Sequence, residues 1–586
     1  METRPPPGTR AAYDSDVTQA STAQSASEGQ PESGPAERTD DSAERPAAVP
    51  PGAAGGGRLP EFVRRRLATV DNRLDGRSWL ATAVVVAIAG ILRLVGLGDI
   101  KGKIFDETYY AREGWALVEH GVEWNFKDNG PSYVVHPPLG KWLIGLGEWA
   151  FGYQDTEHNI SVPGHLLTTS PEFGWRISAA VIGTLSVLLL VRIGRRMFRS
   201  TALGCAAGLL LALDGFHLVL SRTALLDIFL LFFVLAAFGA LVLDRDARRQ
   251  RWATAIDAGL DPSRPGRAGR PPFTVPWWRL AAGVLLGCAI GVKWSALYFV
   301  PVFALLVVLW EVGARRSVGA RRPWRDALLD ELPWLVLAGV AMLLTYLATW
   351  SGWFLSDDGY YRVAARYPNT PGLSDTPVLG ALQNLYTYHR AAFDFHTGLS
   401  TPHKYQSWPW QWLLLGRPVA FHWSGEGNCG APSCASEILL LGTPLLWWSF
   451  LPALAAVVWL GIARRDWRAG AILLGAAGGL LPWFWFALDG RVMFSFYAAP
   501  ALPFLVLAVV YVLGAIVSPA EARAPAPPGS PAAQEAYDRR LFGGVVAGAY
   551  VLLVAICFAY FHPVFVGTLL PYADWSARMW LDGRWI

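Results

Sequence analysis

Charged side chains are scarce in this chain. Only 16% of its 586 residues are Asp, Glu, Lys or Arg, and 53% are hydrophobic, whereas soluble proteins average about 25% charged residues. The hydrophobic residues also gather in runs such as "WLATAVVVAIAGILRLVGLG" and "ILLGAAGGLLPWFWFAL", which reach the roughly 17 to 20 residues that a membrane-spanning helix needs. The shortage of charge therefore argues against a soluble protein and predicts a polytopic membrane protein.

Other absences narrow the function. The pattern G-x-x-x-x-G-K-[ST] does not occur, so no phosphate loop is present to drive transport with ATP. The net charge is only +4, and the basic residues lie in loops between apolar runs, where they set membrane orientation. We therefore expect no nucleic-acid partner.

Cysteine is also rare, with five residues in the chain. Cys429 and Cys434 lie in the polar loop "GEGNCGAPSCASE". If this loop faces an oxidising compartment, a small disulfide is expected. A thiol metal site is disfavoured because no second cysteine pair lies nearby, and we expect no metal elsewhere.

The lengths of the apolar runs predict an all-α membrane protein with about eleven transmembrane helices. Residues 1–76 are rich in Pro, Gly, Ser and charge and are predicted to form a disordered tail, followed by a membrane domain over residues 77–586. The expected spans are residues 78–97, 174–194, 201–216, 218–243, 277–294, 296–313, 332–351, 438–461, 469–487, 491–517 and 541–562.

Arginine-rich connections predict the orientation of these spans. The loops containing "RIGRRMFRS", "DRDARRQR", "ARRSVGARRPWR" and "ARRDWR" should be cytoplasmic. The tail is then cytoplasmic, and two large loops, residues 98–173 and 352–437, are extracytoplasmic. This assignment places the protein in the cell membrane with its unusual polar residues outside.

The first of these loops opens with two adjacent acids, Asp106 and Glu107, in "KIFDETYYAREGWAL". Consecutive side chains on a helix do not face each other, so a two-carboxylate hydrolase is disfavoured. One acid could act as a base while the other orients a group. A merely solvated pair is the alternative, but the apolar and aromatic flanks favour a carboxylate with a perturbed pKa.

Three cations lie near the outer ends of predicted spans: Arg93, Arg176 and Lys293. Charges within spans are costly and usually face a partner or a cavity. Each cation alone could instead extend its charge to the interface. Together they predict positive charge at the depth of a lipid phosphate, which suits a transferase with a lipid-phosphate-linked donor.

Two further segments supply candidate substrate contacts. His136 in "HPPLGKWLI" precedes an amphipathic run that is predicted to form a helix along the membrane surface. The second loop carries His403, Tyr405 and Trp408 in "TPHKYQSWPWQW". Its aromatic residues suit either the lipid headgroup zone or a sugar-binding surface, and its histidines, His422 included, are expected to be surface residues and not metal ligands.

Seven segments together resemble one family, the protein O-mannosyltransferases in their bacterial, actinobacterial-type branch. They are "FDETYYAREGW", "HPPLGKWLI", "FGWRISAA", "LDGFHLVLSRTALLDIFLLFF", "GVKWSALYF", "TPHKYQSWPWQW" and "RVMFSFYAAPALPFL". The resemblance implies the GT-C glycosyltransferase fold. It also implies transfer of mannose from polyprenyl phosphomannose to Ser or Thr of translocated proteins, with inversion to an α-mannoside, with no required cofactor and with the protein translocon as a candidate partner.

The same resemblance implies roles for individual residues. Asp106 and Glu107 match the family's acidic pair, with the aspartate as the favoured catalytic base, and Arg176 and Arg93 match two of its arginines. Supporting positions match Asp214, Arg222 and Asp227.

The chain also departs from the family's eukaryotic members. Val134 stands where they have an aspartate, and the loop over residues 352–437 is too short for their β-trefoil MIR domain. Acceptor choice must therefore use other surfaces.

Two alternative functions stay open at this point. One is another GT-C enzyme that passes a lipid-linked sugar to a glycan or glycolipid. The other is a membrane transporter, which is disfavoured because the distinctive residues gather outside and no internal repeat is visible.

Overall fold

The computed structural model of the chain describes residues 67, 75–518, 527, 529–581 and 585. The tail predicted over residues 1–76 therefore lies almost wholly outside the described residues. Among the described residues, nine helical segments are long and apolar enough to cross a membrane, and two shorter apolar helices accompany them. This agrees with the prediction of about eleven spans.

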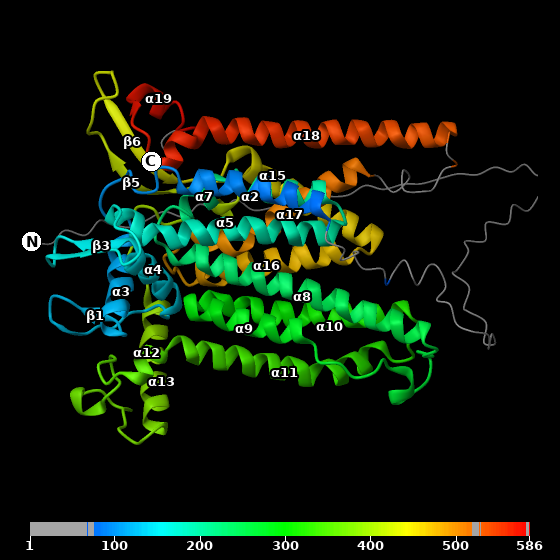
Figure 1. Cartoon of the computed structure of the whole chain (residues 1–586), viewed down its shortest axis with the longest axis horizontal. Helices are drawn as coiled ribbons and strands as arrows, with labels where there is room; N and C mark the ends of the chain where they lie inside the picture. Colours follow the sequence, from blue (N-terminus) through cyan, green and yellow to red (C-terminus); the bar gives the residue numbers. More distant parts are fainter. Residues whose placement is uncertain (1–66, 68–74, 519–526, 528, 582–584, 586) are drawn as a thin grey trace, which may run out of the picture. The chain divides into compact units, whose positions relative to one another are not determined.

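Eleven apolar helices make up the membrane part of the structure (Figure 1). They are α2 (Gly76–Leu94), α5 (Pro171–Phe198), α6 (Thr201–Ala212), α8 (Leu226–Asp257), α9 (Trp277–Val292), α10 (Phe299–Ser317), α11 (Pro323–Thr349), α15 (Pro444–Arg464), α16 (Trp467–Leu488), α17 (Leu502–Val517) and α18 (Pro531–Val566). The 3-10 turns η2 (Trp294–Tyr298) and η4 (Ser495–Ala501) lead directly into α10 and α17.

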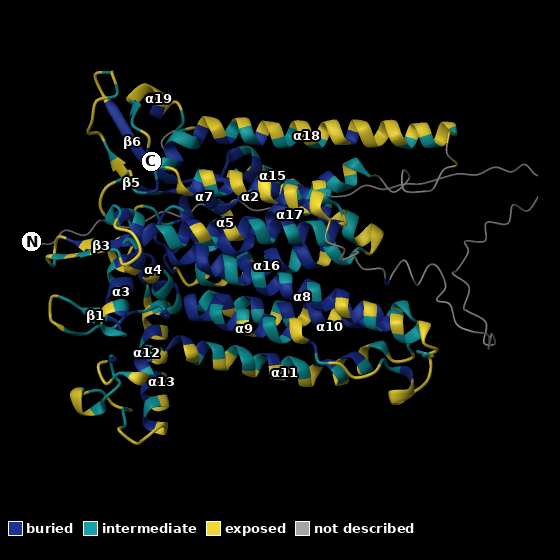
Figure 2. Cartoon of the chain, viewed as in Figure 1, coloured by how far each residue is buried: buried dark blue, intermediate teal, exposed yellow. Residues whose placement is uncertain are grey.

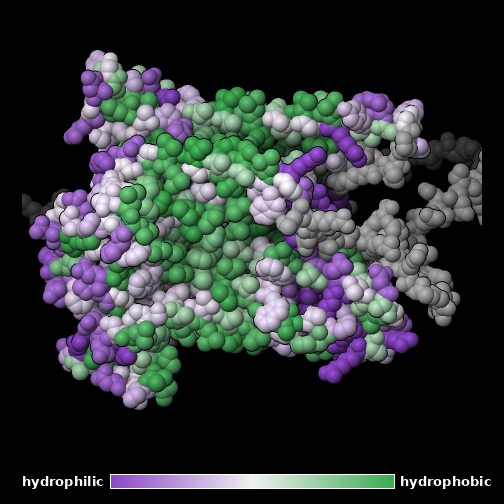
Figure 3. All heavy atoms as spheres, viewed as in Figure 1, coloured by the Kyte–Doolittle hydropathy of each residue, from purple (hydrophilic) through white to green (hydrophobic). Residues whose placement is uncertain are grey.

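Burial separates inner from outer helices (Figure 2). Within an 18-residue apolar window of each segment, 72% of the residues in α8 and 78% of those in the segment formed by η4 and α17 are buried, against 6% in α11 and 17% in α18. The outer helices nevertheless remain hydrophobic, and Figure 3 shows a broad hydrophobic band with hydrophilic residues toward both ends. Exposed apolar surface on this scale is expected where a protein faces lipid.

The predicted boundaries are wrong in two regions of the chain, around residue 217 and at residue 438. Residues 201–216 and 218–243 were expected as spans, but α6 ends at Ala212, a short helix α7 (Gly215–Leu220) follows, and α8 begins at Leu226. Asp214 starts α7 because its Oδ2 accepts a hydrogen bond from the backbone N–H of His217 at 3.0 Å. The span expected over residues 438–461 begins with strand β6 (Cys434–Leu440), and α15 starts only at Pro444, since a short buried strand and a helix have similar apolar runs.

The first large loop folds into two helices and two small hairpins. The helices are α3 (Glu107–His120) and α4 (Leu139–Phe151), and the strands are β1 (Trp124–Asn125), β2 (Gly130–Pro131), β3 (Gly152–Asp155) and β4 (Ile160–Pro163). Helix α4 starts directly after Pro137 and Pro138, as predicted, and packs closely on α5: a Cβ at Gly147 would lie 2.4 Å from the carbonyl oxygen of Gly174. Whether α4 lies along the membrane surface stays a prediction.

The second large loop and the C-terminal segment share one sheet. The loop contains α12 (Ser351–Leu355), η3 (Ala364–Arg366), α13 (Leu379–Gly398), α14 (Pro409–Trp412), β5 (Val419–Ser424) and β6, and strand β7 (Leu570–Pro571) pairs with β6 ahead of α19 (Tyr572–Ser576). Cys429, in the loop before β6, and Cys434, the first residue of β6, are joined in a disulfide as expected. Both large loops lie at the same end of the helices (Figure 1), and their placement outside the cell stays a prediction.

The cap of α7 should matter for stability. Asp214 is fully buried and accepts hydrogen bonds from three N–H groups, those of His217, Thr443 and the Trp447 indole. We expect Asp214→Ala to lower the free energy of unfolding in detergent by about 3 kcal/mol or more, because unsatisfied buried donors cost about 1–3 kcal/mol each. The control is Asp75→Ala, an exposed cap with one hydrogen bond, expected to cost about 1 kcal/mol. Equal losses would contradict the role of Asp214.

Candidate active site at the start of α3

The residue before the acidic pair has an unusual backbone conformation. Phe105 has a φ of 48°, in the left-handed region that bulky residues rarely adopt. Its ring stacks on Phe421 with centroids 4.5 Å apart and meets the edge of Phe496 at 6.0 Å. Strained residues of this kind gather at functional sites, because the surrounding structure must hold them in place.

Asp106 follows at the N-cap position of α3, but its side chain does not cap the helix. The half-buried carboxylate has no hydrogen bond or ion pair within the described part of the chain. Burial raises the pKa of Asp106 to about 6; the positive charge of Lys293 opposes this shift, while the negative charges of Asp227 and Glu113 add to it. The structure thus holds a carboxylate that can accept a proton near neutral pH.

Lys293 supplies positive charge beside Asp106. It ends α9, and its Nζ donates to both carboxylate oxygens of Asp227, at 3.1 and 3.0 Å. The same Nζ lies 5.1 Å from the ring centroid of Tyr497 and 5.5 Å from that of Phe496. Of the three predicted phosphate-binding cations, Lys293 is the one whose charge acts on Asp106.

Glu107 has a different environment from its neighbour. Its side chain is completely buried and forms a bidentate ion pair with Arg176, with Nε–Oε1 and Nη2–Oε2 distances of 2.8 Å each. Its oxygens also accept hydrogen bonds from the Trp175 indole and from the backbone N–H groups of Ile104 and Ala224. Glu107 therefore ties the start of α3 to α5 and to the segment before α8.

Arg176 is fully occupied by these contacts. Besides the two bonds to Glu107, it donates to the carbonyl oxygens of Leu97, Ile100 and Gly102. All five guanidinium hydrogens therefore have an acceptor, which differs from the expected contact with a donor phosphate. Arg93 is likewise buried and donates to His217 Nδ1 at 2.7 Å and to the carbonyl of Ala89 at 3.0 Å.

His136 contacts aromatic rings from both large loops. Its ring is 6.2 Å from Tyr110 of α3 and 5.0 Å from His396 of α13, between ring centroids. Burial, aided by the charge of Lys293, lowers the pKa of His136 well below its usual value. The imidazole is therefore neutral, and it brings the two large loops together.

One cation at this site was missed by sequence reasoning. Arg491 donates from Nε to the carbonyl of His396 at 2.8 Å, lies 5.5 Å from the Tyr497 ring centroid and acts electrostatically on His136. A sequence signal was present. Arg491 is the first residue of the span predicted over residues 491–517, and a position at a span terminus is what singled out Arg176 and Lys293.

The aromatic candidates of the second loop form a path toward this site. His403 meets Phe494 edge-on at 5.1 Å, and Phe494 stacks on Phe496 at 5.2 Å. Tyr405 contacts His403 at 5.8 Å between ring centroids and also faces the cation of Lys404, whose Nζ is 4.8 Å from its centroid, whereas Trp408 stacks on Trp410 at 5.6 Å. His403, and Tyr405 through it, thus connect through rings to Phe105, next to Asp106.

A single group of side chains in the described part of the chain has the spacing of a metal site: Asp155, Glu157 and His158. Lys103 and Arg112 already contact the Asp155 carboxylate, at 3.2 and 3.1 Å, and Arg112 also contacts Glu157. Two cations thus neutralise these acids, and the expectation that no metal binds stays a prediction.

Comparison with known proteins supports the sequence resemblance. A family model described as dolichyl-phosphate-mannose-protein mannosyltransferase matches residues 84–263, and one described as the C-terminal four TMM region of protein-O-mannosyltransferase matches residues 381–585. The polyprenol-phosphate-mannose–protein mannosyltransferase of Mycobacterium tuberculosis (strain H37Rv) is 40% identical over 517 residues, which cover 86% of this chain and 91% of that protein. The Corynebacterium glutamicum protein of the same name is 32% identical over 529 residues, covering 87% and 93%.

A solved structure shares the fold. The S. cerevisiae protein O-mannosyltransferase Pmt1-Pmt2 complex bound to the sugar donor aligns with a TM-score of 0.66 at 16% identity, covering 89% of this chain and 94% of that chain. The prediction of a GT-C membrane fold is confirmed.

The ion pair between Glu107 and Arg176 should be a major stabilising contact. Removing one partner of a buried pair leaves an uncompensated charge and typically costs about 3–5 kcal/mol. We expect Arg176→Gln to lower the unfolding free energy by this order, and Glu107→Gln combined with it to cost less than the sum of the two single changes.

A matched exposed pair provides the control. Arg390 and Asp394 also form an ion pair, at 3.2 Å, but their side chains are 63% and 56% exposed. Arg390→Gln, Asp394→Asn and the double variant should each change the free energy of unfolding by no more than about 0.5 kcal/mol. Additive losses at Glu107 and Arg176 would show that the two side chains act separately.

Proposed function

The chain belongs to the dolichyl-phosphate-mannose-protein mannosyltransferase family, and from this membership we propose how its site performs the transfer. The protein is a multi-pass membrane glycosyltransferase that moves mannose from a polyprenyl phosphate carrier to the hydroxyl of Ser or Thr in proteins. The observation that carries the residue assignment is the unpaired carboxylate of Asp106 with its pKa raised to about 6.

Asp106 is the general base in this proposal. As the acceptor oxygen bonds to the anomeric carbon of mannose, Asp106 takes the hydroxyl proton, and the bond between that carbon and the phosphate oxygen breaks. Attack opposite the leaving phosphate inverts the β-linked donor to an α-mannoside. A base with a pKa near 6 is mostly ionised at neutral pH yet holds the proton well enough to drive the transfer.

Lys293 and Arg491 receive the leaving polyprenyl phosphate. Both lie at the rim of the same aromatic cluster around Tyr497, and negative charge grows on the phosphate as the sugar departs, so fixed cations stabilise the transition state. The planar fork of Arg491 suits two phosphate oxygens. This assignment replaces the donor-phosphate role expected for Arg176 and Arg93.

Glu107 and Arg176 act as positioning residues. Their ion pair fixes the first turn of α3 against α5, so that Asp106, one residue earlier, is held without using its own carboxylate. His136 and the path of rings from His403 to Phe496 offer an apolar and aromatic surface for the sugar and the acceptor.

The site faces the outside of the cell membrane in this proposal, with the N-terminus in the cytoplasm. The disulfide between Cys429 and Cys434 supports it, because disulfides persist in oxidising compartments. Acceptors would then meet Asp106 as they leave the protein translocon, in an extended state in which Ser and Thr are accessible.

Asp106→Asn should abolish most mannosyl transfer without unfolding the protein, because an amide cannot accept the hydroxyl proton. A general base contributes about 10²–10⁴-fold, and a loss of that size in kcat is expected with polyprenyl phosphomannose and a Ser/Thr-rich peptide. Asp128→Asn, an exposed change in the same loop, is the control.

The pH profile separates a base from a structural carboxylate. The base must be ionised, so wild-type kcat/KM should rise with pH through about 6 and level off above it, following the raised pKa of Asp106. The residual activity of Asp106→Asn should lose this step. A profile that keeps the step in the variant would remove Asp106 from the base role.

Arg491→Gln should weaken use of the donor more than use of the acceptor. Charge-assisted hydrogen bonds are worth about 1.5–3 kcal/mol, so the KM for polyprenyl phosphomannose should rise by roughly tenfold or more while the peptide KM stays constant. Arg366→Gln, which removes an exposed arginine of the second loop, should change neither. A raised peptide KM alone would place Arg491 at the acceptor.

A further inference from the structure

A large cavity lies far from Asp106, where α5, α10, α15 and α17 end and α6 and α16 begin, beside the second half of α8. Its volume is about 1850 Å³, well above the roughly 300–1,000 Å³ of ordinary ligand pockets. Helix α5 contacts Glu107 through Arg176 and reaches this cavity with Phe198, 22 residues further along the helix. At 1.5 Å per residue the helix separates the two places by about 33 Å, so the cavity is not part of the transfer site.

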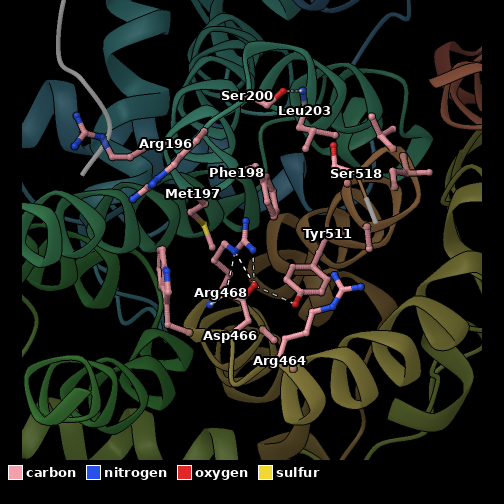
Figure 4. A pocket seen from close by; sticks show the side chains of 18 of the residues that line it. Arg196, Met197, Phe198, Ser200, Leu203, Arg464, Asp466, Arg468, Tyr511 and Ser518 are labelled. Atoms are coloured by element: carbon pink, nitrogen blue, oxygen red, sulfur yellow. Dashed lines mark hydrogen bonds and ion pairs between the residues drawn. The ribbon is translucent and has the colours of Figure 1, made fainter. Parts of the chain in front are cut away.

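The polar part of this cavity is strongly basic. Eight arginines and two aspartates line it, with no lysine or glutamate among the described lining residues. Both aspartates are already engaged: Asp246 accepts from Arg196 at 2.9 Å and from Arg245 at 3.1 Å, and Asp466 accepts from Arg468 and from the Tyr511 hydroxyl. Figure 4 shows the Asp466, Arg468 and Tyr511 side chains directed toward one another at the cavity wall.

Two adjacent arginines remain available there. Arg464 and Arg465 are exposed, and their side chains have no hydrogen bond or ion pair to any residue that the structure describes. Arg465 also has a φ of 48° and ends α15 in the left-handed conformation, where glycine is the usual residue. Arg199 ends α5 in the same way, with a φ of 54°, and lines the same cavity.

The remaining wall of the cavity is apolar and lies deeper among the helices. It is formed by Leu203 and Leu209 of α6, by Gly514 of α17, and by Ala547 and Val551 of α18. Small residues on α17 and α18 leave room between these helices. A cavity with cations at the end of the bundle and aliphatic walls along the helices has the polarity of a lipid, from headgroup to chain.

We propose that this cavity binds an anionic glycerophospholipid, with its phosphate between Arg464, Arg465 and Arg468 and its acyl chains along α6, α17 and α18. Guanidinium groups bind phosphate oxygens in pairs, and basic pockets between transmembrane helices bind lipid headgroups. A free phosphate would use the arginines but leave the aliphatic wall without a partner.

The role of arginines in setting membrane orientation does not by itself explain why so many of them line this cavity. Arginines in loops are sufficient to hold one side of a protein in the cytoplasm, and they need not converge. Here they reach one cavity from four separate helices, α5, α8, α10 and α15, represented by Arg196, Arg245, Arg316 and Arg464. The convergence indicates a ligand with more than one negative oxygen.

The test uses the full-length protein in nanodiscs of phosphatidylcholine with and without phosphatidylglycerol, and native mass spectrometry to measure retained lipid. We expect wild type to retain phosphatidylglycerol and not phosphatidylcholine. Arg464→Gln with Arg465→Gln should weaken retention by about tenfold or more, since each change removes a charge-assisted contact, and the two Lys replacements should restore part of it.

The matched control is Arg321→Gln with Arg322→Gln, another exposed pair of adjacent arginines, before α11, that does not line the cavity. It should retain lipid as wild type does. Equal retention by the Arg464 and Arg465 variant, equal retention of phosphatidylcholine, or displacement of the lipid by inorganic phosphate at similar concentration would each overturn the proposal.

A second measurement does not depend on variants. Wild-type protein in nanodiscs is cross-linked to phosphatidylglycerol that carries a photoreactive acyl chain. Adducts on peptides of α6, α17 or α18 facing the cavity are expected. Adducts restricted to the outer faces of α11 and α18 would show lipid around the protein and none in the cavity.

Discussion

The buried ion pair between Glu107 and Arg176 is the contact on which the proposed site depends. It is formed by residues that are 69 positions apart, and it fixes the first turn of α3 to α5. Glu107 accepts hydrogen bonds from Arg176, the Trp175 indole and two backbone N–H groups, whereas the Asp106 carboxylate has no hydrogen bond to any residue that the structure describes. The two adjacent acids therefore differ in function through their partners, although their chemistry is almost the same.

The raised pKa of Asp106 follows from this difference in partners between the two acids. A carboxylate paired with an arginine would have a low pKa and would be a poor base. Asp106 is half-buried, and Lys293, the cation whose charge acts on it, is already held by Asp227, so the effect of burial is larger and the pKa of Asp106 rises to about 6. The lysine still contributes positive charge where a departing phosphate would need it, without forming an ion pair with the base.

The sequence predicted the outline of this arrangement but not its contacts. Hydrophobic run length placed the spans, because a helix must be apolar over its full length to cross a membrane. It failed at β6 and around α7, where a strand and a capped turn continue the same apolar run. The apolar and aromatic flanks favoured a carboxylate with a perturbed pKa at the acidic pair, and the raised pKa of Asp106 agrees with that expectation. The partner of Arg176 could not be predicted, since the pairing depends on how α3 and α5 pack. Arg491 also stands at the end of a predicted span, like Arg176, and begins the segment "RVMFSFYAAPALPFL", but its contacts with His396 and Tyr497 depend on tertiary packing.

Position at a helix end is therefore a weak guide to which arginine binds a ligand, and the number of hydrogen-bond acceptors around it is a better one. Arg176 has five acceptors, two Glu107 oxygens and three backbone carbonyls, and Arg222 donates to the carbonyl oxygens of Leu92, Arg93, Val95 and Gly96, so both guanidinium groups are engaged within the protein. An arginine satisfied in this way gains little from a phosphate, which would have to displace hydrogen bonds of similar strength. Arg464 and Arg465 lack such acceptors among the described residues, and exchanging water for phosphate oxygens there costs no internal contact. The same residue type thus stabilises the loop beside Asp106 and is available to a ligand at the far end of α5.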